Sequence, residues 1–309
     1  MIASVVTCPQ CGAALAPPSR FARYVTCTFC ACVVTVDPSV VSGARYRDAL
    51  ARWNASDAAD HVRLGDGAWR LIRPLGAGPR TDVWLAERTR WPSERGVLKL
   101  PRDAAGDAVA GREAAALRAI AATGAPIVGT LLPALVLEGV VTAGAHVGRH
   151  VLVARAAPRF TCDRGAAARR WPGGIDPAAS IWMLRRMLEV ARVLVEAGVT
   201  HEAPGPEHWL AEEGEHGLRL VGFGNARVDA ASAGAGAALL VRTAATTLRA
   251  LLVGPESRGV AHPSIDALLR SLAAVPPTLG VAELVGLRAR AGEVGSALPG
   301  GPRFTPILP

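Results

Sequence analysis

The chain has 309 residues, half of them hydrophobic, so it can bury the core of one large domain or of two unequal ones. Aromatic residues make up only 5% of the chain, and the core is therefore expected to consist mainly of Leu, Val and Ala. The net charge of +8 permits an acidic partner, but the arginines are scattered with no run of five. The charge therefore does not by itself indicate a nucleic-acid-binding protein.

Two features of the sequence bear on the cellular location of the protein: its first residues and one uncharged stretch. Residues 1–6 have no basic segment and are too short for the apolar part of a signal peptide, so none is expected. Residues 119–137 carry no charge and are long enough to cross a membrane, but glycines and prolines divide them into short pieces. We expect a helix end, a loop and a buried strand there, in a cytoplasmic protein.

Two C-x-x-C pairs near the N-terminus are separated by fifteen residues: Cys8 and Cys11, then Cys27 and Cys30. This spacing is typical of a zinc ribbon, in which each pair lies on a tight turn and the four sulfurs surround one tetrahedral ion. Gly12 suits such a turn, and residues 33–36 are predicted to form a strand. Four protein ligands close the site, so the zinc is expected to be structural. Disulfides and free thiols are the alternatives, and Cys32 and Cys162 lie outside the set.

Changes in composition along the chain suggest its domain boundaries. Asp37-Pro38 and Ser42-Gly43 interrupt the chain after the ribbon, and Trp69 is predicted to open the next domain. The assignment is a zinc ribbon at 1–41, a linker with a short helix at 42–68, a main domain at 69–300 and a Pro-rich tail at 301–309.

The start of the main domain has the element order of a known family. A glycine-containing turn lies between two predicted strands, and a third strand and a helix follow it. This order resembles the small lobe of the protein-kinase superfamily, in which a Gly-rich hairpin covers the phosphates of ATP, a strand lysine meets them and a helix glutamate holds the lysine. Thr81 stands in place of the third glycine. The cofactor-binding residues that the resemblance implies are Gly76, Gly78, Val83, Lys99 and Glu113.

The second half of the main domain continues the resemblance. Residues 181–195 predict an amphipathic helix, and residues 201–208 resemble the catalytic loop H-R-D-L-x-x-x-N. Residues 222–224, Gly-Phe-Gly, lie where kinases have D-F-G. The resemblance covers roughly residues 69–290 and implies an α+β, bilobal protein-kinase-like fold behind the ribbon. The small lobe would span about 69–155 and the large lobe about 156–300.

Three residues depart from the kinase pattern. Ala203 stands in place of the catalytic aspartate, His208 in place of the metal-binding asparagine and Gly222 in place of the metal-binding aspartate. The Ala- and Gly-rich residues 225–238, before a helix expected at 239–252, also leave little room for a substrate platform. The resemblance therefore implies a pseudokinase with no catalytic residues, acting as a scaffold or regulator in signalling.

Two other functions stay open. A displaced carboxylate, Glu202 or Glu207, could act as the base of an atypical Ser/Thr kinase, although both are also ordinary loop charges. The ribbon and the positive charge could instead form a nucleic-acid-binding module. His201 is expected to be a packed structural histidine.

The implied cofactors are a structural Zn²⁺ and ATP, the latter bound with little help from Mg²⁺ because the residues at 208 and 222 are not its usual ligands. A ribbon joined to a kinase-like domain is similar to a bacterial group whose members accompany von Willebrand A-domain proteins and metal-dependent protein phosphatases. The resemblance thus implies protein partners of these kinds, and neither nucleic acid nor a membrane is expected as a partner.

Overall fold

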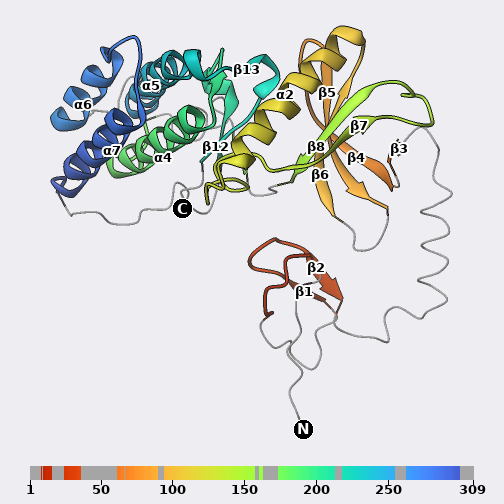
Figure 1. The fold of residues 1–309 in the computed structure, drawn as a ribbon. Helices are drawn as coiled ribbons and strands as arrows, with labels where there is room; N and C mark the ends of the chain where they lie inside the picture. The colour runs from red at the N-terminus through yellow and green to blue at the C-terminus, as the bar shows by residue number, and fades with distance from the viewer. Residues whose placement is uncertain are drawn as a thin grey trace. The chain divides into compact units, whose positions relative to one another are not determined.

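The computed structural model describes residues 8, 10–15, 24–35, 61–65, 67–89, 94–156, 160–162, 173–212, 218–254 and 262–299. The protein is a mixed α/β molecule, and its elements are drawn in Figure 1. It divides into two compact units, one formed by Met1–Asp107 with Leu137–Pro158 and the other by Ala108–Val136 with Arg159–Pro309. The predicted helix of the linker at 45–60 and the tail at 301–309 lie outside the described residues.

The N-terminal cysteine region contains a small antiparallel hairpin. Strands β1 (Tyr24–Thr26) and β2 (Val33–Thr35) pair with Val25 opposite Val34. Where the structure describes this region, four buried residues form its core: Cys8, Leu15, Cys27 and Val34. So small an apolar core needs a further source of stability.

The main feature of the first unit is an antiparallel sheet of six strands. Its order is β3-β4-β5-β6-β8-β7. The strands are β3 (His61–Leu64), β4 (Gly67–Ala77), β5 (Thr81–Arg88), β6 (Arg95–Pro101), β7 (Leu135–Val140) and β8 (His150–Arg155). The sheet thus begins at His61, inside the range that the sequence analysis assigned to the linker, because β3 pairs with the first half of β4.

The core of this sheet is built around Trp69, which is almost fully buried on β4. Gly96 on β6, beyond the intervening strand β5, allows this packing, because a Cβ atom there would lie 3.0 Å from the Trp69 ring and closer still to Val153. The absence of a side chain at residue 96 therefore leaves room for the tryptophan ring on this face of the sheet.

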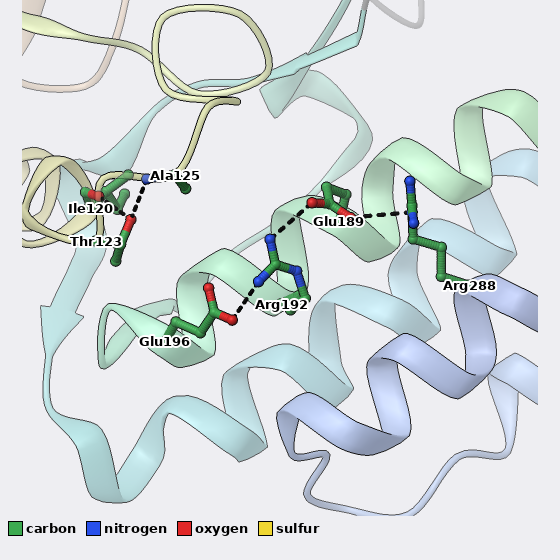
Figure 2. Close-up of polar contacts among 7 residues, drawn as sticks. All are labelled: Ile120, Thr123, Ala125, Glu189, Arg192, Glu196 and Arg288. Atoms are coloured by element: carbon green, nitrogen blue, oxygen red, sulfur yellow. Dashed lines mark hydrogen bonds and ion pairs between the residues drawn. The ribbon is translucent and has the colours of Figure 1, made fainter.

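Helix α2 (Ala104–Ala122) follows β6, and its buried residues Ala110, Ala114, Leu117 and Ile120 recur every three or four positions. At its end, the hydroxyl of Thr123 donates to the carbonyl of Ile120 at 2.7 Å and accepts from the N–H of Ala125 at 3.2 Å (Figure 2). A turn-rich segment then leads to β7. The helix end, loop and strand predicted for residues 119–137 are confirmed, although the strand is half-buried.

The second unit is mainly helical. It contains α4 (Pro177–Glu196), α5 (Ala230–Val253), α6 (Pro263–Ala273) and α7 (Val281–Ser296). Short strands accompany them: β9 (Phe160–Cys162), β10 (Val199–His201), β11 (Trp209–Glu212), β12 (Leu218–Leu220) and β13 (Ala226–Val228). Strands β12, β11 and β9 form one sheet, and β10 pairs with β13.

Helices α4 and α7 are joined by a chain of charges. Arg192 bridges Glu189, at 2.9 Å, and Glu196 on the same helix, while Arg288 of α7 reaches the other oxygen of Glu189 at 3.1 Å (Figure 2). Near the end of α7, Gly295 allows a close approach to α4, since a Cβ atom there would lie 2.9 Å from Ile181. Small residues and ion pairs together hold the two helices against each other.

Helix α5 differs from the prediction. The sequence analysis placed its start at residue 239, but it begins at Ala230 because the Asp229 carboxylate accepts from the N–H of Ala231 at 3.0 Å and caps the helix. Gly234 and Gly236 lie against the Leu279 carbonyl and Thr200, where a side chain would collide. Within the described residues, α5 is the one helix long and apolar enough to span a membrane, and 61% of its most apolar window is buried in the fold.

Candidate functional site

The four N-terminal cysteines lie on two turns of the same design. The N–H of Gly12 donates to the Cys8 carbonyl at 2.8 Å, and that of Ala31 to the Cys27 carbonyl at 2.9 Å. Gly12 and Ala31 both have positive φ, 73° and 57°, which lets each turn fold back on its cysteine. The two pairs therefore present their sulfurs in equivalent ways.

The turns bring four sulfurs together. The Sγ atoms of Cys8, Cys11, Cys27 and Cys30 all lie within 4.8 Å of one another, with Cys8 3.5 Å from Cys30 and Cys11 3.6 Å from Cys27. Cys32 is half-buried beside them and directs its thiol to the Val33 carbonyl. The group of four could hold a metal ion, and its thiol chemistry is compatible with zinc.

The surroundings of these thiols separate their acidities. Burial raises the pKa of Cys8, but the backbone around Gln10 and Cys11 and the thiol of Cys30 outweigh it and lower that pKa to about 6. Burial, reinforced by the neighbouring sulfurs, raises the pKa of Cys30 to about 12. The cluster thus ionises in steps, and a cation would favour the fully ionised state.

The residues predicted to contact a nucleotide lie in the first unit, with one exception. Gly76 pairs with Val83 across β4 and β5, and Val83 pairs with Lys99 across β5 and β6, so the three form one row across the sheet. Gly78 opens the turn that joins β4 to β5. The exception is Glu113, which lies on α2 in the second unit and is 3% exposed.

Lys99 has a distinction that the sequence analysis overlooked. It is the single lysine of a chain whose 34 basic Lys and Arg residues are otherwise all arginine. A lysine offers a compact point charge, whereas an arginine offers a planar fork, so the two are not interchangeable at a binding site. A count of basic residues by type was the signal that could have singled it out.

In the second unit, the loop that resembles a catalytic loop is held by packed rings. His201 is 2% exposed, and its Nε2 lies 3.3 Å from the Val221 carbonyl. Its ring meets those of His208 and Phe223 edge-on at 5.0 and 5.1 Å between centroids. The expectation of a packed structural histidine at 201 is confirmed.

The side chain of His208 occupies the space beside Gly222. Gly222 has φ of +83°, and a Cβ atom there would lie 2.9 Å from Nε2 of His208 and closer still to Cδ2. Both the backbone and the imidazole therefore require glycine at 222. Any side chain at residue 222 would require the His208 ring to move.

The rest of the Gly-Phe-Gly turn is fixed against α2. Phe223 is completely buried, and the Arg112 side chain donates from Nε to the Gly224 carbonyl at 3.1 Å. A Cβ atom on Gly224 would lie 2.6 Å from Val109. The turn is thus held by a buried ring, a hydrogen bond and a close approach.

The candidate displaced bases have other neighbours. Glu202 forms an ion pair with Arg227 at 2.5 Å, and Glu207 lies 3.4 Å from Nδ1 of His208. Ala203 offers no titratable group between them. Residue 203 therefore has no side-chain group that could accept a proton from a substrate.

A buried arginine close to this loop was missed by the sequence analysis. Arg219 on β12 is 5% exposed, donates from Nε to the Thr130 carbonyl at 2.9 Å and also contacts the Gly129 carbonyl. The N–H of Leu220 donates to the Leu131 carbonyl at 3.0 Å. Together these hydrogen bonds anchor the segment that follows α2. Arg219 and Gly129 are 90 positions apart in the chain, so no local sequence pattern predicts their contact.

No family model matches this chain, and no curated protein matches it either.

Proposed function

We propose that this chain is a cytoplasmic, catalytically inactive protein-kinase-like protein, a pseudokinase, that acts as a scaffold or regulator and carries a structural zinc ribbon. The order of the elements supports the fold: a hairpin with a glycine turn, a third strand with Lys99, and a helix with Glu113. Strand β10, a loop, the pair β11–β12 and the Gly-Phe-Gly turn then follow in the order of the kinase large lobe.

The observation that carries the proposal is the packing of His208 against Gly222. Kinases hold their metal ions with an aspartate and an asparagine at these places and use an aspartate as the base where this chain has Ala203. Here the His208 imidazole fills the space that an aspartate side chain at residue 222 would need. Because phosphoryl transfer depends on metal ions and positioning, the loss of all three groups leaves little to stabilise the transferred charge.

Binding of ATP is a separate part of the proposal. Lys99 remains as the single lysine of the chain, in one row with Gly76 and Val83. The ammonium group of a lysine can meet a phosphate without a metal ion. We propose that any ATP is bound through this row with little dependence on Mg²⁺.

The alternative of an atypical kinase with a displaced base receives no support from Glu202. Its carboxylate is engaged by Arg227, and accepting a proton would weaken that ion pair. Protein partners, such as a von Willebrand A-domain protein and a metal-dependent phosphatase, remain part of the proposal through the resemblance alone.

A labelling experiment tests the nucleotide part. An amine-reactive reagent can modify only Lys99 and the terminal amine, so the modification of Lys99 is read directly by mass spectrometry. We expect ATP to protect Lys99 equally with and without Mg²⁺, and the terminal amine, which serves as the internal control, to be unaffected.

A phosphate-transfer assay with labelled ATP tests the inactive part. We expect no transfer to the chain itself or to a general kinase substrate. Mg²⁺-dependent transfer that disappears in Lys99→Ala would overturn the pseudokinase assignment in favour of an atypical kinase. Transfer that persists unchanged in Lys99→Ala would come from a contaminating kinase. The variant thus serves as the control that separates such transfer from activity of this chain.

A further inference from the structure

The turn at the tip of the β4–β5 hairpin is tied to the connection between β6 and α2 by two crossed ion pairs. Arg80 in the turn contacts Asp103 at 2.8 Å, and Arg102 contacts both carboxylate oxygens of Asp82, with Nε at 3.1 Å. Each of the two segments thus contributes one acid and one arginine. The two-pronged geometry of Arg102 on Asp82 is one that lysine cannot reproduce.

Backbone contacts reinforce the same junction. Arg102 donates from Nη1 to the Gly78 carbonyl at 3.2 Å and from its backbone N–H to the Arg80 carbonyl at 3.0 Å. Gly106 lies beneath the turn, where a Cβ atom would be 2.6 Å from the Arg80 carbonyl oxygen. The first turn of α2 can approach the hairpin this closely only because residue 106 is glycine.

Asp103 joins the junction to the helix. Its Oδ1 accepts from the N–H of Gly106 at 2.7 Å while its Oδ2 pairs with Arg80. One carboxylate therefore caps α2 and holds the hairpin turn at the same time. A displacement of the turn would disturb the start of the helix.

The closed turn offers few donors to an anion. The N–H of Gly78 donates to the Thr81 carbonyl at 2.8 Å, and Pro79 has no N–H. We propose that Arg80, Asp82, Arg102 and Asp103 form an ionic latch that holds this turn closed on the first turn of α2, and that the latch must open before the turn can receive a phosphate or another anion.

The latch is weak enough to open readily. Its four side chains are between 36% and 52% exposed, so each pair is weak and is screened by salt. Two such pairs correspond to a shift of roughly two- to thirtyfold in the equilibrium between closed and open turns. The latch itself rests only on contacts within the first unit, whereas the reception of a phosphate by the turn rests on the proposed function.

Hydrogen exchange of the full chain, read by mass spectrometry on peptides that cover residues 76–84, tests the latch. At low ionic strength we expect Arg102→Gln, which removes one of the two pairs, to speed exchange of this turn by roughly one and a half- to fivefold, and Arg102→Lys, which keeps the charge without the fork, to speed it as well. In wild type, raising NaCl to about 1 M screens both pairs and should produce a larger increase, of which Arg102→Gln should keep only the part due to Arg80 and Asp103.

Glu87→Gln is the matched control, because it removes the ion pair with Arg70 on the same two strands away from the turn. We expect it to leave the exchange of residues 76–84 as in wild type. Should Arg102→Gln fail to fold, Asp82→Asn removes the same pair without touching the arginine. Exchange at the wild-type rate in a folded variant that lacks the Arg102–Asp82 pair would overturn the latch.

Discussion

At the scale of single residues, the most informative position is Gly222. Its backbone has positive φ and its neighbour His208 fills the adjacent space, so two independent reasons require glycine there. The identities of residues 208 and 222 should therefore be coupled energetically, although fourteen positions separate them in the chain.

A double-mutant cycle checks this coupling. Gly222→Ala should lower the free energy of unfolding by about 2 kcal/mol or more, through a strained backbone and the collision with His208. In the His208→Ala background the collision is absent, and the same change should cost about 1 kcal/mol less. Chemical denaturation of the four proteins measures both numbers.

Gly286→Ala is the control for that cycle, because a Cβ atom in this position on α7 meets nothing within 4 Å. It should be neutral or stabilising by up to about 1 kcal/mol. Equal losses for Gly222→Ala in both backgrounds would show that His208 does not exclude a side chain at 222.

Arg219 provides a second prediction at this scale. Arg219→Met keeps much of the apolar volume of this buried side chain but removes the donor to the carbonyls of Gly129 and Thr130, so we expect the free energy of unfolding to fall by about 1–3 kcal/mol. Arg270→Met is the control, because Arg270 is exposed and pairs with Asp266 one turn away on α6; it should change stability by less than about 0.5 kcal/mol. Similar losses in both would contradict a structural role for Arg219.

At the scale of elements, the chain relies on helix starts and turns that are fastened by carboxylates. Asp229 caps the start of α5, and Asp103 caps the start of α2. The composition of the residues that follow each cap does not by itself distinguish a helix from a loop. For this reason the Ala- and Gly-rich composition before residue 239 does not predict the helix that begins at Ala230. A cap supplies the first hydrogen bond, after which alanine favours helix.

The hairpin junction should make stability depend on pH. The Arg102 guanidinium holds the pKa of Asp82 below its usual range, and the Gly106 N–H, with help from Arg80, does the same for Asp103. Because both pKa values are lower in the folded chain than the unfolded value of about 3.9, the stabilisation is complete above that value and is lost as the pH falls through the folded pKa.

The measurement compares wild type with the double variant Asp82→Asn and Asp103→Asn. We expect wild type to be the more stable near neutral pH, and the difference in the free energy of unfolding to shrink below about pH 4. A difference that stays constant down to about pH 2 would show that the stabilisation from these carboxylates does not depend on their charge.

At the scale of the whole molecule, the cysteine region is the part that should depend on a metal. Among the described residues of this region, the buried core consists of Cys8, Leu15, Cys27 and Val34, whereas the second unit has an extensive core. A region with so small a core is expected to fold only when its four thiolates bind an ion. The rest of the chain should not need one.

We therefore expect the purified chain to contain about one zinc ion, measured by elemental analysis. A chelator, or the variant Cys11→Ser, should raise hydrogen exchange of residues 8–35 to the rate of an unfolded chain and leave that of α4 and α5 unchanged. Cys32→Ser is the matched control and should retain the zinc, because its sulfur lies outside the group of four. Zinc retained in Cys11→Ser but lost in Cys32→Ser would reassign the ligands.

The sequence by itself determined the features that depend on near neighbours. The two C-x-x-C turns, the glycine turn between two strands, the strand of Lys99 and the amphipathic pattern of α4 all follow from spacings within a few residues, which local backbone geometry converts directly into structure. The identities of Ala203, His208 and Gly222, on which the proposed loss of catalysis rests, are likewise visible in the sequence alone.

Only the tertiary structure decided how distant residues meet. It placed the His208 ring against Gly222, buried Arg219 beneath the segment after α2 and closed the hairpin turn with Arg102 and Asp103. These contacts depend on the packing of whole elements, and the side chains that make them have no periodicity along the chain that would announce their partners.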